Sequence, residues 1–161
     1  MTHFRQIHEP RTHAFTYLLA DTDRREAVII DPASGQTTLY LALLDEIQAR
    51  LTQVLLTHSH EAHVGSAADL CRATGASCVA SGRSGIVGVD VPVDDHAVIP
   101  FGDELLRCRA TPGHTPGCLS YLWRDRVFTG DALLIDDCGS AGTNDAGLLF
   151  DSVTRKLLTL P

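Results

Sequence analysis

Apolar and polar positions along the first third of this 161-residue chain alternate between strand-like and helix-like spacing. β-Branched and aromatic residues on both sides of a polar turn at 21–25 predict two strands, over 16–20 and 26–30. Leucine and isoleucine then recur at helical spacing over 36–50, and a short apolar strand is expected over 53–57. Together these segments predict a β-α-β unit.

The remaining two thirds of the chain continue the same alternation. A helix over 64–74 should end before Gly75, because glycine accepts the left-handed conformation that closes a helix. Glycines and prolines break up 82–100, which is expected to be a loop with at most one short strand. The other expected elements are strands over 77–81, 104–110, 118–123 and 126–128 and a final helix over 146–160. Without an internal repeat or a low-complexity linker, the pattern predicts one α/β (α+β) domain over 1–161.

The composition narrows the class of protein further. Hydrophobic residues make up 44% of the chain and charged residues 20%, which is typical of a globular protein that buries a core. A net charge of -7 without any basic run argues against nucleic acid as a partner. No apolar stretch approaches the 20 or so residues that cross a bilayer, and the first residues have no secretory apolar segment, so we expect a cytoplasmic location and no membrane partner. The five cysteines form no Cys-x-x-Cys pair, so they are expected to be reduced thiols with packing roles, Cys138 being the least certain.

Histidines cluster at one point of the chain. His58, His60 and His63 fall within six residues at the carboxyl end of the strand expected over 53–57. In sheets covered by helices, ligands bind outside the carboxyl ends of strands, and neutral imidazole is the commonest protein ligand for zinc and iron. The cluster therefore predicts a metal site. Isolated histidines are usually solvated, and that is the expectation for the other four outside the candidate site, His3, His8, His13 and His96.

Two further positions complete a candidate ligand set. His114 lies in Thr111-Pro-Gly-His-Thr-Pro-Gly117, where prolines and glycines stiffen a loop between two expected strands. Asp131 follows an apolar strand and a glycine in Phe128-Thr-Gly-Asp-Ala132, although an aspartate here could also be a simple turn former.

The motifs Thr-His-x-His-x-x-His, Thr-Pro-Gly-His-Thr and Phe-Thr-Gly-Asp-Ala, in this order, resemble the metallo-β-lactamase superfamily. The surroundings of the last two are most similar to the persulfide dioxygenases. The resemblance implies an αββα sandwich in which His58, His114 and Asp131 hold one iron(II) that oxidises a thiol persulfide such as glutathione persulfide. Two imidazoles and one carboxylate are also the facial triad of non-haem iron(II) oxygenases. His60 and His63 would then orient ligands and protons, and Asp31 would anchor the ligand loop or, equally well, form a cap or turn.

The sequence departs from the family at three places. Ala62 stands where two-metal relatives have an aspartate ligand, and Glu61 is its neighbour. Ser140 replaces an arginine that helps relatives to bind glutathione, which puts glutathione as the thiol carrier in question. The chain ends at Pro161, so the expected sandwich lacks the family's C-terminal strand and helices, and a homodimer is one way to cover the exposed core.

Two alternatives remain open from the sequence. In the first, His58, His60 and His114 bind Zn²⁺ in a hydrolase that attacks a thioester with a metal-activated water, as hydroxyacylglutathione hydrolases do. In the second, the chain is a non-catalytic remnant that binds metal weakly, as Ala62, Ser140 and the early end suggest.

Overall fold

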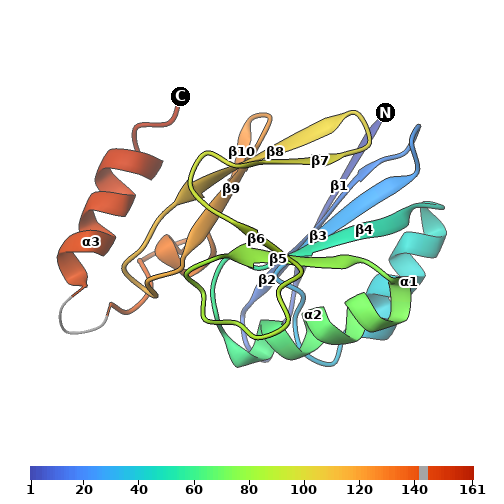
Figure 1. Ribbon diagram of the computed structural model, residues 1–161, viewed down its shortest axis with the longest axis horizontal. Helices are drawn as coiled ribbons and strands as arrows, with labels where there is room; N and C mark the ends of the chain where they lie inside the picture. Colours follow the sequence, from blue (N-terminus) through green and yellow to red (C-terminus); the bar gives the residue numbers. More distant parts are fainter. Residues whose placement is uncertain (142–144) are drawn as a thin grey trace.

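Two β-sheets pack face to face in the computed structural model, which describes residues 1–141 and 145–161. Helices α1 (Thr37–Glu46) and α2 (Glu61–Thr74) cover the outer face of one sheet, and α3 (Ala146–Asp151) lies at the opposite end of the molecule from α1 (Figure 1). This layered arrangement confirms the α/β fold class that the alternating pattern predicts.

The larger sheet carries the β-α-β units. In the described part of the chain its order is β1 (Thr2–His8), β2 (Phe15–Asp21), β3 (Glu26–Ile30), β4 (Arg50–Leu55), β5 (Ser77–Ser81) and β6 (Val91–Val93). β1 to β3 are antiparallel, whereas β3 to β6 are parallel. The carboxyl ends of β3 and β4 therefore meet at the same end of the sheet, and Asp31 and His58 follow these two strands.

The smaller sheet is an antiparallel meander. Its strands in the described chain are β7 (Val98–Phe101), β8 (Glu104–Ala110), β9 (Leu119–Trp123) and β10 (Arg126–Phe128), in the order β10-β9-β8-β7. A 3-10 turn, η1 (Gly130–Ala132), follows β10, and α3 continues into a π-helical segment, η2 (Ser152–Leu157).

Side chains of β2 and β3 enter two different cores, because successive side chains of a strand point to opposite faces. Leu18 and Ile29 pack against α1 and α2 in a core that also contains Tyr40 and Leu70. Their neighbours Leu19 and Val28 face the smaller sheet and pack in a second core with the aromatic side chains Phe101, Tyr121 and Trp123. Burial on both faces explains why 26–30 is a continuous apolar run rather than an alternating one.

Strands predicted over 26–30, 77–81, 104–110 and 126–128 are confirmed to the residue. The prediction for 82–100 is wrong, because β6 lies within it and a second strand, β7, begins within it. Each is the edge strand of its sheet and each contains a proline, which an edge strand tolerates because one side needs no backbone hydrogen bonds. β1 is also an edge strand and was not predicted, since its alternation is only between half-buried and exposed positions.

Several boundaries also differ from the expectations. The helix expected over 36–50 ends at Glu46, because Gln48 adopts a left-handed φ of 52° and Arg50 already pairs with β3. The helix expected from 64 begins at Glu61, inside the histidine cluster. The single helix expected over 146–160 is α-helical only to Asp151 and π-helical from Ser152.

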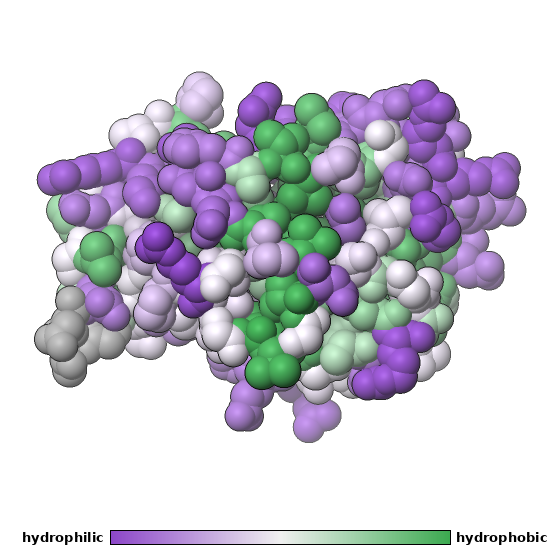
Figure 2. Space-filling model, in the orientation of Figure 1, coloured by the Kyte–Doolittle hydropathy of each residue, from purple (hydrophilic) through white to green (hydrophobic). Residues whose placement is uncertain are grey.

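Hydrophobic residues form a band down the middle of one face, between hydrophilic ends (Figure 2). Exposed hydrophobic side chains of the described chain include Val87, Val91 and Val98, all within 82–100. Among the described residues, no helix has the length and apolarity that crossing a membrane requires.

Candidate metal centre

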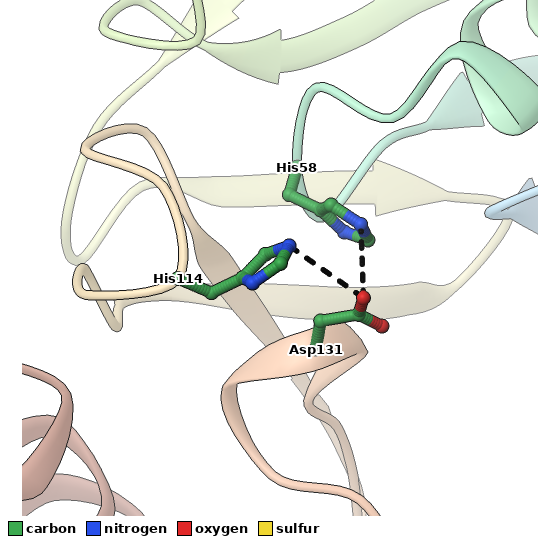
Figure 3. Close-up of side chains that lie close together, drawn as sticks. All are labelled: His58, His114 and Asp131. Atoms are coloured by element: carbon green, nitrogen blue, oxygen red, sulfur yellow. Dashed lines mark ion pairs between the residues drawn. The ribbon is translucent and has the colours of Figure 1, made fainter. Parts of the chain in front are cut away.

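Three loops from distant parts of the chain bring His58, His114 and Asp131 together (Figure 3). His58 Nε2 and His114 Nε2 each lie 3.6 Å from the same atom, Asp131 Oδ2. The two imidazole rings meet edge to face, with their centroids 5.1 Å apart. The first loop follows β4, the second joins β8 to β9, and the third follows β10, so both sheets contribute to one cluster.

A chain of hydrogen bonds behind His58 determines which of its nitrogens carries the proton. The Thr57 hydroxyl donates to Asp31 Oδ2 over 2.6 Å, and Asp31 Oδ1 accepts from the Thr57 backbone N–H over 2.8 Å. Because the hydroxyl has a single proton, its oxygen must accept the 2.8 Å hydrogen bond that joins it to His58 Nδ1. His58 is therefore the Nδ1–H tautomer, and its Nε2 lone pair faces Asp131.

The protonated nitrogen of His114 is identified in the same way, from a different hydrogen-bond partner. Its Nδ1 lies 2.8 Å from the backbone carbonyl oxygen of Ser140, which can only accept, so Nδ1 carries the proton. The loop around His114 is held against the C-terminal helix, because Ser152 donates to the Pro112 carbonyl over 2.8 Å. Gly113, with φ 140°, permits this approach, since a Cβ there would lie 2.4 Å from the Leu149 Cα.

The position of the Asp131 carboxylate depends on the glycine that precedes it in the sequence. Gly130 has a left-handed φ of 51°, and a Cβ built on it would lie 2.2 Å from Thr57 Oγ1. Only glycine allows the η1 backbone to lie against the Thr57 side chain. This close approach places the carboxylate opposite both histidines.

The cluster has the chemistry of a cation site. His58 is only 2% exposed, and burial lowers the pKa of its imidazole, which keeps it neutral and available as a ligand. Among the described side chains, its Nε2 is one of the few buried polar atoms without a hydrogen-bond partner. A buried polar atom of this kind needs an explanation, and a metal ion supplies one. Ligands bonded to one ion at about 2.1 Å cannot lie more than about 4.2 Å apart, and both 3.6 Å separations meet that limit.

The sequence of the chain matches known proteins over almost its whole length. The profile of the Metallo-beta-lactamase superfamily matches residues 10–80. The human mitochondrial persulfide dioxygenase ETHE1 is 41% identical over 162 residues, which cover 98% of this chain and 63% of that protein. The crystal structure of ETHE1 from Myxococcus xanthus superposes with a TM-score of 0.92 at 39% identity and covers 98% of this chain and 71% of that one. This chain belongs to the metallo-β-lactamase superfamily.

A second type of superfamily member is also similar. The hydroxyacylglutathione hydrolase of Polaromonas sp. is 37% identical over 154 residues, which cover 91% of this chain and 58% of that protein. The chain thus spans about three fifths of the length of the curated relatives that it matches. The expected family and its similarity to persulfide dioxygenases are confirmed by these comparisons.

His60 and His63 lie beside the cluster but are not part of its group of mutually close ligand atoms. Their rings are 5.8 Å and 5.7 Å from that of His58, and His63 Nδ1 lies 3.3 Å from the Pro32 carbonyl oxygen. Among the described residues, the one group of three or more mutually close ligand atoms contains His58, His114 and Asp131, and not His60. Asp31, whose role the sequence leaves open, hydrogen-bonds the ligand loop and also takes a turn conformation with φ 49°.

A cavity of about 450 Å³ leads to the centre and is lined by Asp31, His58 and Asp131. His8 and His13 line it as well. Both are exposed, as the sequence predicts, but the sequence offers no sign that they face the metal centre. His96 is exposed too, whereas His3 is half-buried, contrary to expectation.

The thiols largely follow the prediction. Cys78, Cys108 and Cys118 are buried, Cys71 is half-buried, and Cys138 is exposed. The segment around Ser140, in which the sequence differs from its relatives, is described only in part, because 142–144 lie outside the described residues.

Proposed function

We propose that the protein is a dioxygenase that uses one iron(II) to oxidise the sulfur of a thiol persulfide. The observation that carries the proposal is the convergence of two Nε2 lone pairs and one carboxylate oxygen on a single point. The 41% identity to a persulfide dioxygenase supports the choice of reaction within the superfamily. The proposed site residues are His58, His114 and Asp131.

Bound iron(II) would supply open coordination positions at which a sulfur anion and dioxygen can bind side by side. The chain's own residues prepare that position. The Asp31–Thr57 pair and the Ser140 carbonyl hold the two imidazoles in the tautomer that offers Nε2. Tyr17 lines the cavity, and burial raises the pKa of its phenol, so it stays protonated and remains a hydrogen-bond donor.

The test is to purify the protein without oxygen, measure bound metals by elemental analysis, and then follow oxygen uptake with glutathione persulfide. We expect one iron per chain and persulfide-dependent oxygen uptake. His114→Ala should lose both, whereas His96→Asn should keep both, because the His96 side chain is 75% exposed and does not line the cavity and asparagine tolerates the φ of 66° there. Stoichiometric zinc with no iron and no oxygen uptake would reject the dioxygenase.

Zinc-dependent thioester hydrolysis is the second candidate, favoured by the 37% identity to a hydroxyacylglutathione hydrolase. It would use His60 in place of Asp131 beside His58 and His114. The distances among the described ligand atoms favour Asp131 instead. Hydrolysis of a glutathione thioester by the zinc-loaded protein, abolished by His60→Ala and kept by Asp131→Ala, would favour this candidate. A melting temperature that neither iron nor zinc raises would favour a remnant without catalysis.

A further inference from the structure

The cavity that leads to His58 and Asp131 has two chemically different walls. One wall is the β1–β2 hairpin, which contributes His8, His13 and Phe15. The other is the segment that follows η1, from Leu133 to Asp137, with apolar side chains first and then the carboxylates of Asp136 and Asp137. A molecule that enters the cavity therefore meets N–H donors from the hairpin and negative charge from the segment that follows η1.

Hydrogen bonds within the hairpin hold the two histidines in place. The Glu9 N–H donates to the Ala14 carbonyl over 2.9 Å and closes the turn that contains His13. The Glu9 carboxylate accepts from the Thr12 N–H over 2.7 Å and from the Thr12 hydroxyl over 2.8 Å. His8 immediately precedes this closed turn, and His13 is its last residue before Ala14.

The rings of these histidines are ordered against each other. Their centroids lie 5.6 Å apart with an interplanar angle of 31°, and the His8 ring also lies 5.1 Å from that of Phe15. Both side chains are exposed, so their N–H groups are accessible to a ligand. Two preorganised imidazoles at the mouth of a cavity can bind an anion with little further loss of side-chain entropy.

The charges around the cavity determine where a negatively charged group of a ligand can bind. Among the described residues that line it there is no lysine or arginine, so histidines are its only side chains able to carry positive charge. His58 and His63 are buried beside the metal centre, which leaves His8 and His13 at the mouth. A carboxylate would be repelled by Asp136 and Asp137 and attracted to the hairpin wall. Ser140, in place of the arginine expected from the family resemblance, cannot supply this contact.

We propose that His8 and His13 bind a carboxylate of the substrate's thiol carrier, so that the enzyme selects persulfides of carboxylate-bearing thiols. This inference rests on the proposed dioxygenase function, because it assigns the part of the substrate that lies away from the reacting sulfur. His8 and His13 are specificity-determining residues in this assignment, and they take no part in the chemical step.

The experiment compares wild type with the His8→Phe/His13→Gly double variant. Phenylalanine keeps the ring contact with Phe15 but has no N–H, and glycine removes the side-chain donor at position 13 while adopting its φ of 58° without strain. With glutathione persulfide we expect the KM of oxygen uptake to rise about tenfold in the double variant, as one lost charge-assisted contact would produce, with kcat changed less than about twofold. Melting temperatures establish that the variant is folded, and His96→Asn, which tolerates the φ of 66° at that position, is the matched control for an exposed histidine.

Substrate variation separates a lost carboxylate contact from a disturbed cavity. The persulfide of glutathione diethyl ester has no free carboxylate, so wild type should bind it as weakly as the double variant does, and the variant should not distinguish ester from acid. A KM for glutathione persulfide that is the same in both proteins overturns the inference and leaves the dioxygenase intact. If wild type consumes no oxygen with any persulfide, the proposed function fails. Calorimetric titration of the metal-loaded proteins with glutathione then decides the role of the histidines, and equal affinities overturn it.

Discussion

Replacing Asp31 by asparagine tests whether hydrogen bonding behind His58 determines the metal-binding tautomer. Asparagine has nearly the same shape as aspartate and tolerates the left-handed φ of 49°, so the backbone should not change. Its carbonyl oxygen can still accept from the Thr57 N–H. Its NH₂ group then faces the Thr57 hydroxyl, where wild type has a carboxylate oxygen at 2.6 Å. The hydroxyl must turn and donate to His58 Nδ1, which shifts the imidazole proton to Nε2 and removes the lone pair from the metal site.

The cost follows from the groups left without partners. To bind metal, the variant has to return His58 to the Nδ1–H tautomer, and both neighbours of the Thr57 hydroxyl are then donors. Its proton loses its acceptor in a side chain that is only 2% exposed. A buried unsatisfied donor costs about 1–3 kcal/mol, so a cost of about 2 kcal/mol weakens metal binding roughly thirtyfold. This estimate lies within the range of about 10- to 100-fold measured for residues that support metal ligands.

The assay is an anaerobic competition titration of iron(II), and separately of Zn²⁺, against a chelating indicator. Thr57→Ser is the matched control, since it keeps the hydroxyl and should keep the wild-type affinity. Thermal melts of the metal-free proteins report any change in the fold itself. If Asp31→Asn folds normally and binds both metals within about twofold of wild type, the tautomer argument is refuted.

Three further predictions concern the site and its scaffold. Gly130→Ala should abolish metal binding and destabilise the protein by roughly 2 kcal/mol. The reason is that the new Cβ would lie 2.2 Å from Thr57 Oγ1. A denaturation midpoint and a metal content equal to those of wild type would contradict this prediction. Glu104→Gln should lower the melting temperature at pH 7 by about 2–4 °C. The hydrogen bond from Arg124 lowers the pKa of Glu104, so its stabilisation is present above the unfolded-state value of roughly 4.3 and is lost as pH falls through the lower folded-state value. The difference between the two proteins should therefore shrink as the melts are taken to more acidic pH and vanish once Glu104 is protonated in the folded state, and a difference independent of pH would exclude the charge as its cause. Removing the metal with a chelator should lower the melting temperature. Compared with protein at a metal concentration of 100 Kd, the loss of stability is about 2.7 kcal/mol. Equal melting temperatures with and without metal would exclude a metal site in the native state.

The sequence predicts the parts of the fold in which burial and periodicity agree. Strands β3 and β5 are buried almost throughout, and the middle of β8 alternates between buried and exposed positions; all three end at clear turn residues, so their bounds can be read from the pattern. β1 and β6 lie at the edges of the larger sheet and bury little, so their residues have no pronounced alternation. Each pairs with the neighbouring strand in the sequence, β1 with β2 and β6 with β5, so the weak burial of their side chains is what makes them hard to predict.

For the candidate site, the sequence indicates side chains whose type has a chemical meaning, but not backbone groups. His58, His114 and Asp131 are recognisable as donors in stiff loops at strand ends, and the structure brings these three together. The partner of His114 Nδ1 is the main-chain carbonyl of Ser140, which any residue at that position could supply. The positions of His8 and His13 at the cavity mouth likewise depend on how the β1–β2 hairpin packs, which the local sequence does not reveal.

The number of metals follows from the position of one carboxylate. In two-metal relatives an aspartate occupies the position of Ala62, and the sequence leaves open whether Glu61 replaces it. In the structure Glu61 is exposed and lines a separate shallow hollow with Gly65 and Val87, away from the cavity that contains Asp131. A second cation beside His63 would therefore have no carboxylate from the start of α2 to balance its charge. The second site thus lacks the carboxylate ligand expected at this position, which favours one metal per chain. One ion with open coordination positions is sufficient for a persulfide sulfur and dioxygen to bind side by side, as the proposed function requires.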